Sequence, residues 1–250
     1  MVPLNCQPTE KPVHKRDGVL DVVRIWHSIQ GEGPFAGVPA VFVRLAGCNL
    51  QCPDCDTDYT STRSQVHPTR LVENVTEVRH KASQELGHAV RTRLIVLTGG
   101  EPFRQNLASA VRAVLEAGFR VQVETNGTLF PVDLSHGGYD DSFPWYGDVT
   151  VVCSPKTGQV NEQLRPHVHC LKYVVEDGRV DERDGLPTQV LGNQCLIARP
   201  WDGFRGEIIL NPADQGDPEL NRKNLQAAAK SCLKFGYRLG VQLHKLVGLD

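Results

Sequence analysis

Short apolar runs that alternate with helical patterns constrain the fold of this chain most. Residues 94–97 are apolar at every position, which is typical of a strand buried on both faces. A helical pattern follows, with Leu107, Val111 and Val114 on one face, and 121–124 returns as a strand. This β-α-β order favours a parallel sheet covered by helices.

The remaining elements extend the same alternation. One helix has Leu71 and Val75 on its apolar face and Thr69 as a candidate N-cap. Loops rich in Gly, Pro and Asp are predicted at 133–147 and 177–205. Together the elements predict an α/β fold with an open or partial barrel. Further strands are predicted at 19–26, 40–45, 149–152, 171–175, 208–210 and 239–243, and a last helix with Leu225, Ala229, Cys232 and Leu233 on its apolar face.

Composition narrows the class of protein. The chain has 250 residues, enough for one large domain, and 27 Lys and Arg against 29 Asp and Glu give no electrostatic reason to bind nucleic acid or an anionic membrane. Residues 1–17 are polar and lack the apolar segment of a secretory signal, so we expect a flexible arm at 1–17 and a single domain at 18–250. Eight cysteines without such a signal favour a reducing, cytoplasmic environment.

Three of the cysteines lie within eight residues, directly after a predicted strand. Cys48, Cys52 and Cys55 have the spacing C-x3-C-x2-C. Three thiolates on one loop can hold three irons of a [4Fe–4S] cluster and leave the fourth iron open. A structural zinc site needs four ligands, and the sequence offers only single candidates such as His67 and Cys153. The spacing favours the cluster, while zinc binding and chance clustering of buried cysteines remain alternatives.

Polar and glycine-containing segments follow three other predicted strands. Gly99-Gly100-Glu101 would let a ligand approach the backbone, and Glu101 offers an acceptor for an ammonium group. Residues 124–128 and 154–156 follow two later strands. Each of these segments alone is also typical of an ordinary turn.

Taken together, the cysteine loop and the Gly-Gly-Glu segment resemble the radical S-adenosylmethionine superfamily. Further segments resemble the 7-carboxy-7-deazaguanine synthase family within it: 28–33 (SIQGEG), 42–45 (FVRL), 55–57 (CDT) and 242–245 (QLHK). The resemblance is scattered over about 22–250 and implies a partial, reduced (β/α)6-type barrel with its site at the carboxyl ends of the strands. Asp54 departs from the family, which usually has an aromatic residue there.

The resemblance also implies a reaction and its cofactors. A lyase of this family converts 6-carboxy-5,6,7,8-tetrahydropterin to 7-carboxy-7-deazaguanine, contracting the ring and releasing ammonia, in deazapurine (queuosine or archaeosine type) biosynthesis. It would use a [4Fe–4S] cluster, S-adenosylmethionine, Mg²⁺ and an external electron donor such as a flavodoxin, as a homodimer. The alternatives are another radical S-adenosylmethionine enzyme, such as a glycyl-radical activase, and a zinc-binding interaction domain.

Site residues follow from the resemblance, position by position. Without it, Arg44 would be taken as a surface ion pair and His244 as a core histidine. Substrate binding is implied for Gln30, Gly31, Glu32, Arg44, Thr98, His244 and Asp250, of which Glu32, Arg44 and His244 would be catalytic. Contacts to S-adenosylmethionine are implied for Asp54, Cys55, Asp56, Gly99, Gly100, Glu101, Thr125, Asn126, Ser154, Pro155, Lys156, Asn211 and Pro212. The metal ligands would be Cys48, Cys52 and Cys55 for the cluster and Thr57 for Mg²⁺.

Overall fold

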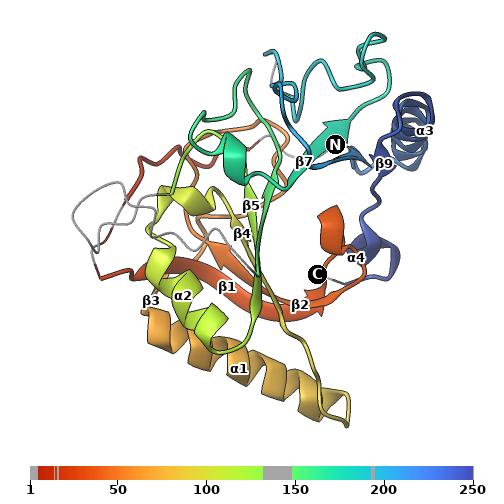
Figure 1. Cartoon of the computed structure of the whole chain (residues 1–250). Coiled ribbons are helices and arrows are strands. Elements are labelled where there is room, and N and C mark those ends of the chain that lie inside the picture. Colours follow the sequence, from red (N-terminus) through yellow and green to blue (C-terminus); the bar gives the residue numbers. More distant parts are fainter. Residues whose placement is uncertain (1–4, 14, 16, 132–147, 193–194, 250) are drawn as a thin grey trace.

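A computed structural model of the chain describes residues 5–13, 15, 17–131, 148–192 and 195–249 (Figure 1). These residues form a nine-stranded sheet of order β3-β1-β2-β4-β5-β6-β7-β8-β9. The sheet is parallel from β2 onward, and β1 and β3 join it antiparallel at one edge. The strands are β1 Leu20–Ile29, β2 Pro39–Leu45, β3 Ser64–Val66, β4 Leu94–Gly99, β5 Arg120–Thr125, β6 Val149–Cys153, β7 Cys170–Val175, β8 Glu207–Pro212 and β9 Arg238–Leu239.

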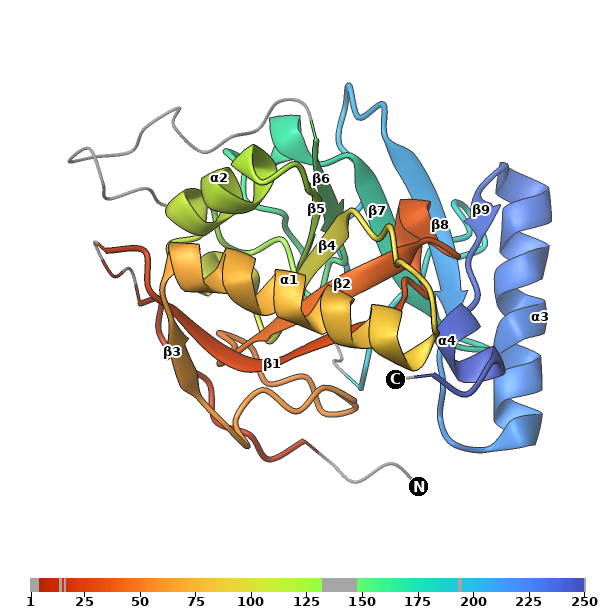
Figure 2. The same ribbon diagram turned by 90° about the horizontal axis from the view of Figure 1, so that it is seen from below.

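Helices pack on the sheet in two groups (Figures 1 and 2). Helices α1 and α2 pack against each other over β1 and β5, whereas α3 packs on β7 and β8. The described sheet ends in the edge strands β3 and β9 and is not closed, which confirms the partial, reduced barrel predicted from the sequence. The helices are α1 Pro68–Glu85, α2 Ala108–Glu116, α3 Pro218–Phe235 and α4 Leu243–Leu246, with 3-10 turns η1 Gly33–Phe35, η2 Pro102–Arg104 and η3 Arg165–His167.

The register of the parallel strands brings the polar segments together at the carboxyl ends of the strands. Leu45 at the end of β2 pairs with Gly99 at the end of β4. Thr125 of β5 pairs with Cys153 of β6 in the same sense. Because parallel strands share their direction, the segments that follow them lie side by side, as expected for a site in an open α/β sheet.

Two predicted boundaries are wrong at the ends of elements. The strand predicted at 239–243 ends at Leu239, and the chain turns so that Leu243 N donates to Gly31 O at 3.1 Å and begins α4. Helix α1 begins at Pro68 with His67 as its N-cap, so Thr69 lies inside the first turn. Proline at the first helical position fits because its missing N–H has no partner there.

The apolar face predicted for α3 is correct at Cys232 but wrong at its two leucines. Leu225 is 38% exposed and Leu233 is 89% exposed. The buried face carries Asn224, Ala228 and Cys232, with Ser231 beside them. Asn224 is satisfied on the buried face, since its side chain donates to Ala213 O at 2.9 Å and accepts from Asp177 N at 2.8 Å. Leucines therefore face outward on this helix.

The structure describes the predicted loop 177–205 and the predicted arm 1–17 only in part, and does not describe the predicted loop 133–147. No helix or strand lies between β7 and β8 in the part that is described, as predicted for 177–205. The predicted loop 133–147 lies outside the described residues. In the predicted arm, residues 5–13 are hydrogen-bonded to the cysteine loop, while its flexibility and the division at residue 18 stay predictions. Among described helices, none is long and apolar enough to span a bilayer.

Candidate active site

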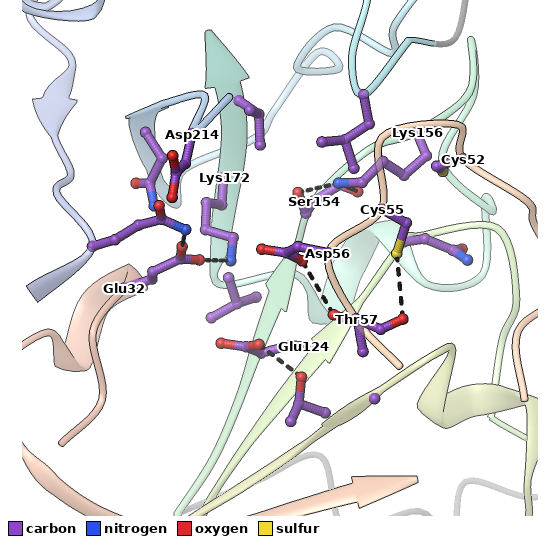
Figure 3. Close-up of a pocket in the computed structure, with 18 of the residues that line it drawn as sticks. Glu32, Cys52, Cys55, Asp56, Thr57, Glu124, Ser154, Lys156, Lys172 and Asp214 are labelled. Atoms are coloured by element: carbon purple, nitrogen blue, oxygen red, sulfur yellow. Dashed lines mark hydrogen bonds and ion pairs between the residues drawn. The ribbon is translucent and has the colours of Figure 1, made fainter. Parts of the chain in front are cut away.

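A cavity of about 360 Å³ lies at the carboxyl ends of the parallel strands and collects most of the predicted site residues (Figure 3). This volume is in the range of small-molecule sites. In the view of Figure 3, Cys52, Cys55 and Lys156 lie at one side and Glu32, Lys172 and Asp214 at the other. The predicted residues that line it are Gln30, Glu32, Arg44, Cys48, Cys52, Asp54, Cys55, Asp56, Thr57, Thr98, Gly99, Gly100, Thr125, Asn126, Ser154, Lys156, Asn211, Pro212 and His244.

Glycines allow the cysteine loop and the Gly-Gly-Glu segment to touch through their backbones. A Cβ on Gly99 would lie 2.2 Å from Leu45 O, and one on Gly100 would lie 2.1 Å from Gly47 O and 2.8 Å from Cys48 Cβ. Gly99 also has φ +127, which side-chain-bearing residues rarely adopt. These glycines therefore fix the position of Cys48 at the floor of the cavity.

The three cysteines suit a cluster better than a single metal ion. Cys48 and Cys52 are buried, Cys55 is half-buried, and none of them forms a disulfide. Burial raises the pKa of Cys48 to about 12 and also raises the pKa of Cys55. In the described part of the chain, no three His, Cys, Asp or Glu side chains converge as one ion requires. Cluster cysteines bind different irons and need no common point, so three thiols on one loop that lines the cavity are compatible with a [4Fe–4S] group.

Glu101 lies beneath the cavity and does not line it. Its carboxylate accepts from Thr125 Oγ1 at 2.8 Å, Asn126 N at 2.7 Å and Phe103 N at 3.0 Å. Burial raises its pKa to about 7, against the opposing effect of these three donors. Glu101 thus ties β4 to the end of β5, and its contact with an ammonium group stays a prediction.

Two further contacts hold the cofactor side of the cavity. Asn126 Nδ2 donates to Asn49 Oδ1 at 2.9 Å, which joins the cysteine loop to the end of β5. Lys156 Nζ donates to Ser154 Oγ at 2.6 Å. Burial lowers the pKa of Lys156, and the neighbouring charge of Lys172 lowers it further.

Asn211 of β8 carries a buried amide without a hydrogen-bond partner in the described part of the chain, at the wall of the cavity. Its side chain is buried, yet its Nδ2 and Oδ1 have no hydrogen-bond partner among the described residues. Buried polar groups are rarely left unpaired in folded proteins. The two atoms lie in a residue that lines the cavity, so they are suited to bind a polar ligand.

An ion pair between Glu32 and Lys172 lies at the other side of the cavity (Figure 3). Gln242 Nε2 donates to the second carboxylate oxygen of Glu32 at 2.7 Å. Burial alone would raise the pKa of Glu32, but the charge and hydrogen bond of Lys172 and the hydrogen bond of Gln242 lower it to about 2. Glu32 is therefore an anion at neutral pH. Burial alone would lower the pKa of Lys172, but the charges of Glu32 and Glu124 raise it.

Gln30 and Thr98 meet at a second carboxylate. Gln30 Nε2 donates to Glu124 Oε1 and Thr98 Oγ1 donates to Glu124 Oε2, both at 3.0 Å. Gln30 Oε1 in turn accepts from Glu32 N at 3.1 Å. The Gln30 amide thus links the Glu124 carboxylate to the backbone of Glu32, and both glutamates line the same cavity.

Arg44 supplies a cation on an aromatic surface. Its guanidinium lies 5.0 Å from the centre of the Trp26 ring, and Trp26 stacks on Phe42 with centroids 5.0 Å apart. The Nε of Arg44 is buried and has no hydrogen-bond partner in the described structure. Arg44 is therefore held in place by its aromatic neighbour while a donor remains available.

Four predicted residues do not line the cavity or cannot be placed. Gly31 lies behind the lining, where a Cβ would be 1.8 Å from His244 Nδ1. Glu101 and Pro155 are likewise absent from the lining. Asp250 lies outside the described residues, so the role of its carboxylate stays a prediction.

The site-residue set predicted from the sequence misses several polar groups that line the cavity. Lys172, Glu124, Gln242 and Asp214 all contribute to it. Lys172 had a usable signal, because a lysine inside the apolar run 170–175 cannot be buried without a partner. Glu124 gives a similar signal, because it is a charged residue between buried neighbours at the end of β5. Asp214 lies in a loop and gave none.

Comparisons with known proteins agree with this geometry. A family model described as a 4Fe-4S single cluster domain matches residues 29–167, which include all three cysteines. A 7-carboxy-7-deazaguanine synthase from Rhodospirillum rubrum is 40% identical over 235 residues, covering 91% of this chain and 92% of the relative. One from Aquifex aeolicus is 31% identical, covering 95% and 97%.

A solved structure shares the fold. The crystal structure of QueE from Escherichia coli matches with a TM-score of 0.61 and 22% identity, covering 90% of this chain and 94% of that one. The solved structure supports the fold. The family assignment rests on the sequence identity of the relatives over nearly the full chain and on the matched cluster domain. This chain belongs to the 7-carboxy-7-deazaguanine synthase family of radical S-adenosylmethionine enzymes.

Proposed function

We propose that this chain converts 6-carboxy-5,6,7,8-tetrahydropterin to 7-carboxy-7-deazaguanine with release of ammonia. One observation carries the proposal: a single cavity joins a three-cysteine loop to a set of carboxylate, amide and guanidinium groups. Cys48, Cys52 and Cys55 would hold the [4Fe–4S] cluster. When bound, the cluster and S-adenosylmethionine supply the 5′-deoxyadenosyl radical chemistry of the reaction.

The residues around the cysteine loop would bind and aim S-adenosylmethionine. Gly99 and Gly100 leave backbone exposed to the cavity, and Asn211 offers an unpaired amide. Lys156 and Ser154 present polar atoms at a neighbouring strand end. Asp54, Asp56, Thr125, Asn126 and Pro212 complete this group, and the buried loop would keep water from the reacting atoms.

The opposite side of the cavity would bind the pterin. The guanidine-like edge of a pterin presents adjacent N–H donors, and the anionic Glu32 is a matching acceptor. Gln30 and Thr98 would add hydrogen bonds to the ring. Arg44 would meet the substrate carboxylate, because its fixed fork of donors matches that group. His244 would hold or donate a proton at the ring, an inference that rests on its place in the lining.

Mg²⁺, an electron donor and a second subunit belong to the same proposal. Thr57 lines the cavity, and its hydroxyl donates to Asp56 Oδ1 at 3.3 Å. Mg²⁺ prefers oxygen ligands and keeps several waters, so the Thr57 hydroxyl would be one ligand beside the substrate carboxylate and bound water. The family resemblance supports a flavodoxin-like donor, a homodimer and a cytoplasmic location.

A product assay tests the proposal. The chain, reconstituted anaerobically with iron and sulfide, is incubated with S-adenosylmethionine, dithionite and the pterin, with and without Mg²⁺, and the products are followed by mass. We expect 7-carboxy-7-deazaguanine, in larger amount with Mg²⁺. Formation of 5′-deoxyadenosine without that product would show that S-adenosylmethionine is cleaved without conversion of the pterin, and would overturn the proposal.

A further inference from the structure

Residues 5–13, named the strap here, run beside the loop that carries the three cysteines (Figure 2). Asn5 N donates to Pro53 O at 2.8 Å. Glu10 N donates to Cys48 O at 2.7 Å. The strap backbone therefore holds the loop at two points, one at its first cysteine and one between the other two.

Side chains of the strap add contacts at the same loop. Asn5 Nδ2 donates to Cys52 O at 3.1 Å. Gln7 Nε2 donates to Thr57 O at 2.8 Å, and its Oε1 accepts from Tyr59 N at 2.8 Å. The amide of Gln7 thus pairs with the backbone after Cys55 as a neighbouring strand would.

A buried arginine anchors the strap to the fold. Arg104 of η2 is fully buried, and its Nη1 donates to Lys11 O at 2.8 Å. Its Nη2 donates to Ala46 O at 2.9 Å and lies 3.2 Å from the carboxylate of Glu10. Because η2 directly follows the Gly-Gly-Glu segment, this one guanidinium joins the strap to both segments that form the floor of the cavity.

The strap contacts the loop from the side away from the cavity. No strap residue is part of the cavity lining. Between the end of β2 at Leu45 and the start of β3 at Ser64, the loop forms no helix or strand of its own. Only a few of its backbone hydrogen bonds are internal, such as Cys55 N to Cys52 O at 3.2 Å, and the strap supplies further donors to the carbonyls of Cys48, Cys52 and Thr57.

We propose that the strap is part of the cluster site, with Asn5 and Gln7 as positioning residues. They hold the cysteine loop in the shape that binds the cluster and slow the loss of iron. The inference rests on the three cysteines holding the cluster and does not depend on which substrate is used. The outer contacts of a metal site usually change metal affinity or activity 10- to 100-fold, which sets the expected effect at about tenfold or more.

The test compares the variant Asn5→Ala/Gln7→Ala with two controls on the reconstituted full chain. Thr9→Ala removes an exposed strap side chain that makes no hydrogen bond among those described. Val75→Ala destabilises the buried core on α1, remote from the lining of the cavity. For each protein we measure the rate of iron loss to a chelator, well below its unfolding temperature, and the EPR spectrum of the reduced cluster.

We expect the double variant to lose iron about tenfold faster or more and to show an altered EPR spectrum, while both controls resemble the wild type. Iron loss at the wild-type rate in the double variant would overturn the proposal. An equal acceleration in Val75→Ala would also overturn it, because general destabilisation would then explain the effect. Product formation is scored separately, so a chain that holds its cluster but does not convert the pterin contradicts only the proposed function.

Discussion

At the scale of single residues, the pair Lys172–Glu32 sets the charge of the substrate side of the cavity. Its side chains are only 10% and 17% exposed. Removing one partner of such a pair leaves a buried charge, which costs about 3–5 kcal/mol. We therefore expect Lys172→Met to lower the free energy of unfolding by roughly that amount and to raise the KM for the pterin. Denaturant unfolding and steady-state kinetics measure the two effects.

The exposed pair Arg70–Glu73 gives the matched control, since both side chains are 61% exposed. Arg70→Met should change the free energy of unfolding by about 1 kcal/mol or less. Equal effects of the two substitutions would contradict the special role given to Lys172. The signature of that role is a KM effect confined to Lys172→Met.

Glu101 gives the protein a pH dependence of known sign. Its pKa is raised from 4.5 to about 7 by burial, so the folded chain binds a proton that the unfolded chain has released between those values. Stability contributed by this group therefore falls as the pH rises from about 4.5 to 7, by at most on the order of 3 kcal/mol. The free energy of unfolding of the wild-type apoprotein, measured relative to that of the Glu101→Gln apoprotein, should therefore fall between pH 5 and pH 7.5. A pH-independent difference in unfolding free energy would contradict this.

At the scale of elements, the close backbone contact at Gly100 links β4 to the cysteine loop. A methyl group there would overlap Gly47 O, so Gly100→Ala should displace Cys48 and lower the iron bound after reconstitution. Gly87→Ala is the control, because Gly87 has φ +71 but nothing within 4 Å of its Cβ position. It should cost about 1–2 kcal/mol of stability and bind iron normally. Normal iron content in Gly100→Ala would refute the link.

Helix α3 tests the corrected orientation. Asn224→Ala removes the partners of Ala213 O and Asp177 N, and such losses cost about 1–3 kcal/mol per buried group. Leu233→Ala should have almost no effect because Leu233 is 89% exposed. Thermal unfolding of both variants measures this directly. A larger loss for Leu233→Ala would restore the leucine face as the buried one.

Helix α3 shows why the buried face of an element cannot always be predicted from the sequence pattern. Central strands such as β4 were predictable because burial on both faces demands apolar residues throughout. Asn224 is buried for its hydrogen bonds with distant backbone, which helical periodicity does not record. Likewise the end of β9 depends on a contact with Gly31 that is remote in sequence.

At the scale of the whole molecule, the strand order explains why the candidate site was largely predictable. Motifs that directly follow parallel strands must meet at one edge, so the sequence alone is enough to group Gly99, Thr125 and Ser154. Lys172 and the strap were missed for the opposite reason. A buried lysine needs a partner whose position only the fold gives, and residues 5–13 have no periodicity that indicates what they contact.

The central claim is that one cavity brings a cluster-binding loop and a pterin-binding set of groups together. The most direct measurement counts 5′-deoxyadenosine and 7-carboxy-7-deazaguanine together in reconstituted wild type, Cys52→Ala and Glu32→Gln. We expect the wild type to form 7-carboxy-7-deazaguanine and Cys52→Ala to form neither compound. Glu32→Gln should form 5′-deoxyadenosine, but its yield of 7-carboxy-7-deazaguanine should fall by roughly tenfold or more because a charge-assisted contact to the pterin is lost. Wild-type product formation in Glu32→Gln, or turnover in Cys52→Ala, would contradict the account.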